Sequence, residues 1–127
     1  MLSLIMVIIS LFAESNYMTI TIEDFAKIEL RVGKIIQVDD FPEAKKSAYK
    51  LKIDFGEFGI KTSSSRITDL YTKEELLGKL VVCVVNLAPR QVGPFVSEVL
   101  TTGFYSADGS VVLAAPDKDV PLGTRLG

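Results

Sequence analysis

The sequence contains no histidine, the residue that most often transfers protons in catalysis near neutral pH and most often binds metals. Its absence excludes Ser-His-Asp triads and Cys-His pairs. A metal site would need carboxylates alone, and no calcium-loop spacing is present. The glycine patterns of dinucleotide-binding and phosphate-binding loops are absent as well. We therefore expect a binding protein rather than an enzyme, with no cofactor and no metal.

Cysteine is almost absent too, since Cys83 stands alone within the apolar run 81–85. One cysteine cannot form an intramolecular disulfide, which fits a reducing compartment. The apolar neighbours indicate a buried structural thiol rather than a reactive one. We expect a cytoplasmic protein.

An excess of positive charge is also lacking. Lys and Arg number 14 against 16 Asp and Glu, which gives a net charge of −2. Proteins that hold nucleic acid through many phosphates are usually basic. If this chain binds RNA, we expect a local cluster of basic residues to do so.

Residues 1–12 are almost wholly apolar. This run is shorter than the roughly 20 residues that cross a membrane, and no basic residue precedes it as in a signal peptide. Three explanations stay open: upstream sequence before a natural start at Met18, an apolar extension covered by a second subunit, and a weak targeting segment. We expect the first, which divides the chain into an extension at 1–17 and one domain at 18–127, without a membrane span.

Short segments typical of strands fill this domain. Residues 48–55 alternate between apolar and charged side chains, and 58–63 follow across a Gly56-Glu57 turn, which predicts a hairpin. Gly33 indicates a bulge or sharp bend within its strand. The further expected strands are 30–40, 80–86, 95–105 and 110–115.

Two short helices and two loops complete the pattern. We expect a helix over 20–27 with Thr21 as its cap, and another over 72–78 with a Thr72-Glu75 capping box. The loops are 41–46 and 89–94. A small antiparallel barrel with a helix between its third and fourth strands is the OB arrangement. The predicted fold is thus all-β, a five-stranded antiparallel OB-fold barrel with one or two short helices, although an SH3-like barrel fits the same strands.

Two polar segments stand out. Residues 61–66 place four consecutive hydroxyl side chains, one threonine and three serines, between two cations, and these either cap a helix or bind phosphate or a peptide backbone. Residues 86–91 place an amide, a proline and the guanidinium of Arg90 after an apolar strand. Arg90 either grips a phosphate or carboxylate, or lies in solvent at a plain turn.

A family resemblance rests on several motifs in order. Residues 28–35 read IELRVGKI and resemble the opening strand of the tRNA-binding domain family, found as appendages of methionyl- and phenylalanyl-tRNA synthetases. Residues 86–90, NLAPR, followed by 97–100, SEVL, are similar to the family's second signature, which usually continues Ser-x-Gly-Met. Glu98 and Val99 therefore depart from it. The segments that resemble the CsaA-like branch are 41–44, 53–56, 60–64 and 121–127.

The resemblance implies an OB fold, a homodimer and two roles, which are tRNA binding and a chaperone-like part in protein export. The partners would be tRNA or other structured RNA, and unfolded or pre-export polypeptides; a docking partner of a synthetase is the other open function. The residues we expect to contact RNA are Arg31, Lys34, Lys61, Ser63, Ser64, Arg66, Asn86, Arg90 and Ser97. Those that would line a peptide groove, or else belong to the core, are Phe95, Phe104 and Tyr105.

Overall fold

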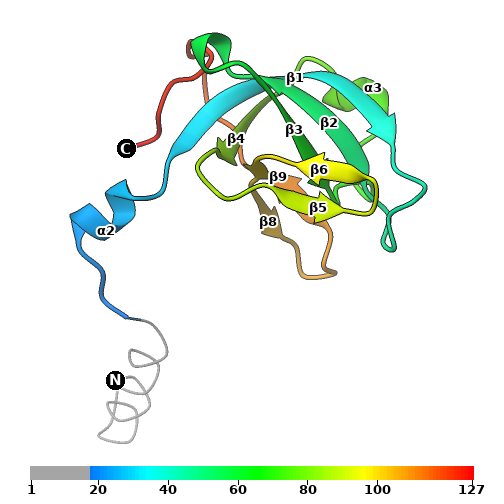
Figure 1. Cartoon of the computed structure of the whole chain (residues 1–127), viewed down its shortest axis with the longest axis horizontal. Coiled ribbons are helices and arrows are strands. Elements are labelled where there is room, and N and C mark those ends of the chain that lie inside the picture. Colours follow the sequence, from blue (N-terminus) through cyan, green and yellow to red (C-terminus); the bar gives the residue numbers. More distant parts are fainter. Residues whose placement is uncertain (1–17) are drawn as a thin grey trace, which may run out of the picture.

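A five-stranded antiparallel sheet forms most of the domain in the computed structural model, which describes residues 18–127 (Figure 1). The expected extension at 1–17 lies outside the described residues. The strand order is β3-β2-β1-β4-β7. Its strands are β1 (Leu30–Asp40), β2 (Tyr49–Asp54), β3 (Ile60–Ser65), β4 (Leu80–Val84) and β7 (Leu100–Thr101).

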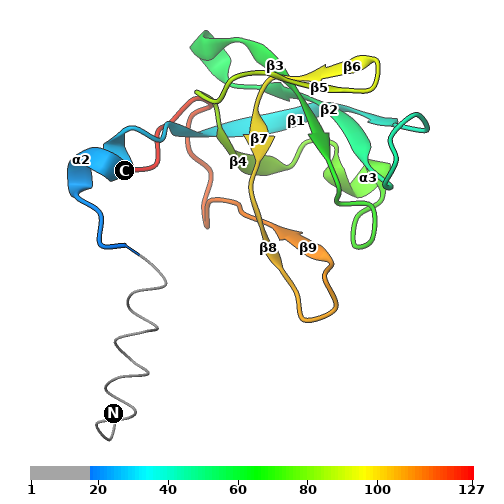
Figure 2. The same ribbon diagram turned by 60° about the horizontal axis from the view of Figure 1, so that its bottom comes forward.

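Smaller elements surround this sheet. Two hairpins are formed by β5 (Arg90–Val92) with β6 (Phe95–Ser97) and by β8 (Gly103–Tyr105) with β9 (Val111–Leu113). Figure 2 shows the β8–β9 hairpin extending below the barrel. The α-helices of the described part are α2 (Ile22–Ala26) and α3 (Lys73–Leu76), with one 3-10 turn at Gly56–Phe58. Neither helix of residues 18–127 has the length and apolar character needed to cross a membrane.

The long strand β1 gives the sheet its curvature. Its first half, Leu30 to Lys34, pairs with β4, and its second half, Lys34 to Asp40, pairs with β2. A register shift between Ile35 and Gln37 separates the two halves in the ladder with β2. β1 thus pairs with two neighbouring strands over different parts of its length, as the wall of a coiled barrel requires.

The core lies inside this coil. Alternation along β2 directs Leu51 and Ile53 inward, where they are at most 1% exposed, and Ile35, Phe55 and Val81 join them in one cluster. Cys83 belongs to the same cluster, and burial raises the pKa of its thiol to about 12. The thiol therefore stays protonated and unreactive at neutral pH, as the sequence indicated.

The barrel closes where β3 meets residues 96–99. The amides of Glu98 and Val99 donate to the Thr62 carbonyl at 2.9 and 3.1 Å. The Thr62 amide donates to the Glu98 carboxylate at 3.0 Å, and its hydroxyl to the Val96 carbonyl at 2.8 Å. We call this set of bonds the Thr62 seam. It joins β3, one edge of the sheet, to the segment that leads into β7, the other edge. The predicted OB-type barrel is thus confirmed, mostly β and nearly closed.

Both predicted helix caps are confirmed. Thr21 accepts from the Asp24 amide, and Thr72 accepts from the Glu75 amide, each at 3.1 Å. The Thr72 amide donates back to the Glu75 carboxylate at 2.9 Å, which lowers the pKa of Glu75 below its ordinary value. These reciprocal bonds satisfy backbone donors that a helix start leaves unpaired.

Three sequence expectations were wrong. Residues 89–94 are not a plain loop, because β5 pairs with β6 across a turn whose Gly93 has φ 55°. The expected strand 95–105 is broken into β6, β7 and β8, because it leaves one sheet edge to join others. Gly33 is not the bulge, since the register shift lies between Ile35 and Gln37. Glycine is needed there because the Ile53 and Phe55 side chains occupy the space that a Cβ would take.

We predict that Gly33→Ala lowers the free energy of unfolding by about 1–3 kcal/mol, the usual range for overpacking a core. An added Cβ would lie 2.7 Å from Cε1 of Phe55 and nearer still to Ile53. Denaturant titration measures the change. Gly127→Ala is the matched control, since nothing lies within 4 Å of its Cβ position. An unchanged midpoint for Gly33→Ala would contradict the packing described above.

Candidate nucleic-acid interface

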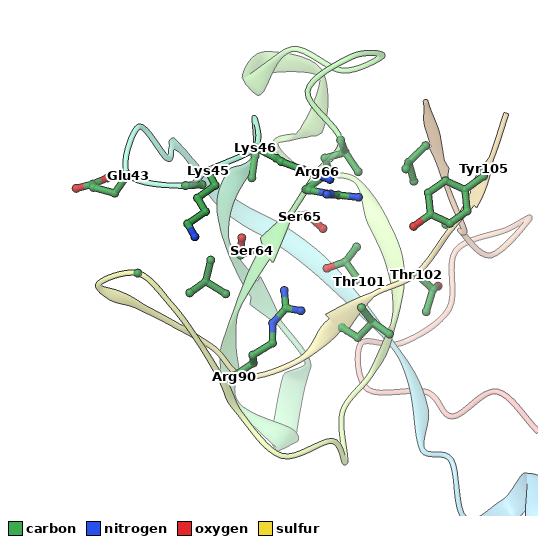
Figure 3. Close-up of a pocket in the computed structure, with 18 residues that line it drawn as sticks. Glu43, Lys45, Lys46, Ser64, Ser65, Arg66, Arg90, Thr101, Thr102 and Tyr105 are labelled. Atoms are coloured by element: carbon green, nitrogen blue, oxygen red, sulfur yellow. The ribbon is translucent and has the colours of Figure 1, made fainter. Parts of the chain in front are cut away.

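A pocket of about 800 Å³ opens on one side of the barrel (Figure 3). Its walls are the loop 43–46, the end of β3, the hairpin strand β5 and the passage from β7 into β8. These segments lie far apart in sequence and meet here because the Thr62 seam draws β6 and β7 onto β3. We call this site the cationic pocket, after the basic residues that line it: Lys45, Lys46, Arg66 and Arg90.

None of these four cations forms an ion pair within residues 18–127. Among the described lining residues Glu43 is the acidic one, and its side chain points away from the pocket in Figure 3. Lys45 and Arg90 reach toward Ser64 from opposite walls. Uncompensated positive charge in a concave site attracts anions, so the pocket is suited to phosphate.

The hydroxyls of the pocket differ in their availability. The Thr101 hydroxyl donates to Ser63 at 2.9 Å, and the Thr102 hydroxyl donates to the Val82 carbonyl at 2.7 Å. The half-buried Ser64 hydroxyl makes no hydrogen bond within the described part of the chain, although the Ser64 amide does. Ser64 is therefore free to bind a ligand oxygen at the position toward which Lys45 and Arg90 point.

The structure brings Ser64, Arg66 and Arg90 together, as the two polar segments suggested. It adds Lys45 and Lys46, which sequence reasoning left in the 41–46 loop. The adjacent lysines were the available signal, but nothing in the sequence placed that loop opposite β5. Lys34 and Lys61 carry charge on β1 and β3 but do not line the pocket.

Arg31 is held inside the fold. Its guanidinium donates to the Glu29 carboxylate at 2.7 and 3.0 Å and to the Gly123 carbonyl at 2.7 Å. It also lies 3.9 Å from the centre of the Phe58 ring, and only 15% of the side chain is exposed. These contacts fasten the C-terminal segment to β1, so the charge of Arg31 is already neutralised by Glu29.

Asn86 is likewise engaged by the protein. Its Oδ1 accepts from the Glu29 amide at 2.9 Å, and its Nδ2 donates to the Lys27 carbonyl at 2.7 Å. Both ends of the amide thus clamp the chain that leads from α2 into β1. A ligand could bind Asn86 only by replacing these bonds.

Two further predicted contacts are buried serines. Ser63 is fully buried and accepts from Thr101, while Ser97 is 9% exposed and its hydroxyl accepts from the Ser64 amide at 2.9 Å. Both extend the closure made by the Thr62 seam. Glu98 and Val99, which depart from the family signature, act at the same place, since Glu98 accepts from Thr62 and Val99 fills the core at 5% exposure.

The three predicted aromatic residues do not form one groove. Phe95 is half-buried and packs edge-on against Phe41, with ring centres 5.6 Å apart. Phe104 and Tyr105 are 67% and 77% exposed, which excludes the core alternative for them. They point to opposite sides of β8, and Tyr105 alone of the three lines the cationic pocket.

The turn after Tyr105 is well defined. The Asp108 carboxylate accepts from the Ser110 hydroxyl at 2.6 Å and from the Ser110 amide at 3.0 Å. These bonds hold the pKa of Asp108 below its ordinary value, so the carboxylate and the turn it stabilises persist at neutral pH.

No group of metal-ligating side chains is found among residues 18–127.

The family model described as a putative tRNA-binding domain matches residues 30–125. The chain belongs to this family. Two similar solved structures are the chaperone CsaA from Bacillus anthracis, 42% identical with a TM-score of 0.82, and the CsaA chaperone from Picrophilus torridus, 49% identical with a TM-score of 0.80. They cover 87% and 86% of this chain and are themselves covered completely. The resemblance to the CsaA-like branch is thereby confirmed.

Curated relatives include much longer proteins of the same family. The methionine–tRNA ligases of Nanoarchaeum equitans and Pyrococcus abyssi are 41% and 40% identical over 115 and 114 residues. The matches cover 90% and 89% of this chain but only 14% and 15% of the ligases. The relationship thus concerns a small part of each enzyme.

We expect Asn86→Ala to lower the free energy of unfolding by about 1–2 kcal/mol, because two hydrogen bonds that hold residues 27 and 29 are lost. Thermal and denaturant unfolding measure this loss. Leu87→Ala, at an exposed neighbour, is the control and should leave stability unchanged. Undiminished stability together with weakened RNA binding would instead make Asn86 a ligand contact.

Proposed function

We propose that this domain is a non-catalytic tRNA-binding module of the CsaA type, which holds RNA phosphates in the cationic pocket and acts in the cytoplasm. The observation that carries the proposal is the meeting of Lys45, Lys46, Arg66 and Arg90, none of them ion-paired among residues 18–127, with the Ser64 hydroxyl in a single concave site of a tRNA-binding family member. This local cluster of cations can attract RNA although the net charge of the chain is −2.

The pocket binds by charge and by geometry. Arg66 and Arg90 each present a planar fork of donors that fits two phosphate oxygens, while Lys45 and Lys46 add point charges on a loop. The Ser64 hydroxyl donates a hydrogen bond to the phosphate, at a position between Lys45 and Arg90. Because each phosphate neutralised releases counterions, binding should weaken steeply as salt rises.

Alanine substitution of Arg66 or Arg90 should weaken binding of bulk tRNA about tenfold at low salt and reduce the slope of log K against log salt by about 1 each. Gel-shift titrations over a salt series give both quantities. Lys118→Ala is the matched control, an exposed cation that does not line the pocket. Absence of tRNA binding by the wild type at low salt would refute the proposed function.

A peptide-binding chaperone is the second candidate, favoured by the similarity to two CsaA chaperones. Exposed Phe104 and Tyr105 on the β8–β9 hairpin would offer apolar contacts to an unfolded or pre-export polypeptide. Suppression of the aggregation of a model client by a protein that does not bind tRNA would favour this function over the first. A docking role beside a synthetase has no specific observation in its favour.

We also propose that the working form is a homodimer joined through α2. None of the five residues of α2 is buried, and Ile20, Ile22 and Leu126 are 57%, 73% and 45% exposed. Figure 1 shows α2 standing away from the barrel beside the C-terminus, where Arg125 donates to the Ala26 carbonyl. So short a helix needs a packing partner to persist, and a second copy would cover these side chains.

Replacement of Ile22 by aspartate should convert the dimer to a monomer, because it buries a charge in the proposed apolar contact. Sedimentation equilibrium of the full chain measures the change in mass. Glu23→Gln, on the same exposed helix, should leave the dimer intact. A wild-type protein that sediments as a monomer at micromolar concentration would contradict the proposal.

A further inference from the structure

The cationic pocket has two kinds of wall. One part carries the basic side chains, and the other is apolar, formed by Ala48, Ile67, Leu100 and Val111. A bare phosphate or a lone sugar would leave the apolar part uncovered. The volume of about 800 Å³ is in the range of sites that enclose a small organic ligand. The pocket therefore suits a ligand that is anionic at one end and flat and apolar at the other.

Tyr105 stands at the edge of this pocket. It is 77% exposed, and its β9 partner Val111 also lines the site. In Figure 3 its ring projects toward the pocket from the wall opposite the loop 43–46, and Arg66 extends toward it. An exposed aromatic face next to cations is the arrangement by which proteins stack the bases of single-stranded nucleic acids.

We propose that the cationic pocket takes an unpaired nucleotide of RNA, with its phosphate among Lys45, Arg66 and Arg90 and its base stacked on Tyr105. This inference rests on the proposed function and narrows it to single-stranded segments. A base within a duplex is already stacked and paired, so it cannot enter a concave site without leaving the helix. A duplex would engage the cations at the rim but not Tyr105.

The test compares a fluorescein-labelled five-nucleotide RNA with the same five nucleotides base-paired in a hairpin stem, by fluorescence anisotropy. The wild type should bind the single strand more tightly. Tyr105→Ala should weaken that binding about 5- to 150-fold, the effect of losing one base–aromatic stack, without changing the salt slope. Tyr105→Phe should retain it. The control Phe104→Ala alters the neighbouring aromatic on the other side of β8 and should have no effect.

A 2-aminopurine base in the single strand gives an independent reading, because stacking quenches its fluorescence. Quenching should accompany binding to the wild type and Tyr105→Phe and be lost with Tyr105→Ala. Tyr105 is exposed, so Tyr105→Ala should unfold at the same temperature as the wild type. Equal affinity for the paired and unpaired RNA, or undiminished binding by Tyr105→Ala, would overturn the inference.

Measurements on bulk tRNA separate the two proposals. If tRNA binds and Arg90→Ala weakens it while Tyr105→Ala is neutral, the nucleotide-stacking inference fails and the proposed function stands. If tRNA does not bind the wild type at low salt, both fail. Displacement of the labelled RNA by an equal concentration of an acidic, aromatic peptide would also overturn the inference, since the pocket would then take a polypeptide.

Discussion

The Thr62 seam is the interaction on which the rest of the structure depends. Without it the sheet would end at two open edges, β3 and β7, with unpaired backbone donors and acceptors. With it, the Thr62 carbonyl accepts from the amides of Glu98 and Val99, and the Thr62 amide donates to the Glu98 carboxylate. Ser64 follows Thr62 in β3 and Arg66 comes directly after that strand, so the bonds that close the barrel also place these residues opposite Arg90. The same bonds therefore close the barrel and assemble the cationic pocket.

Much of the fold was predictable because local physical rules determine it. The alternation of 48–55 and the capping boxes at Thr21 and Thr72 depend only on neighbouring residues, and the structure has them where the pattern placed them. The β5–β6 hairpin was missed because Pro89, Gly93 and Pro94 are typical of loops, and its pairing shows only once β6 lies against β3. Gly33 was misinterpreted because its reason is a contact with Phe55, remote in sequence.

Only part of the candidate site was predictable, because the sequence shows which residues can bind phosphate but not where the fold places them. Residue type revealed groups able to bind phosphate, but it could not show which of them the protein already uses. Arg31 and Arg90 look alike in the sequence, yet Arg31 is paired with Glu29 and Arg90 has no partner among the described residues. Lys45 and Lys46 lie outside any strand pattern, so only the folded chain brings them to the pocket.

The two hydrogen bonds of the Asn86 side chain bear on how domains of this family can come to bind different ligands. The amide belongs to the signature by which the family is recognised, but here it binds the backbone at Lys27 and Glu29. Of the residues that would choose a ligand, Lys45 and Tyr105 lie outside the motifs that carry the resemblance, whereas Ser64 and Arg90 lie within them. Part of the binding preference is thus set by residues that do not identify the family. Substitutions in the loop 43–46 and in the β8–β9 hairpin can therefore change the ligand while the family signature around Asn86 is kept.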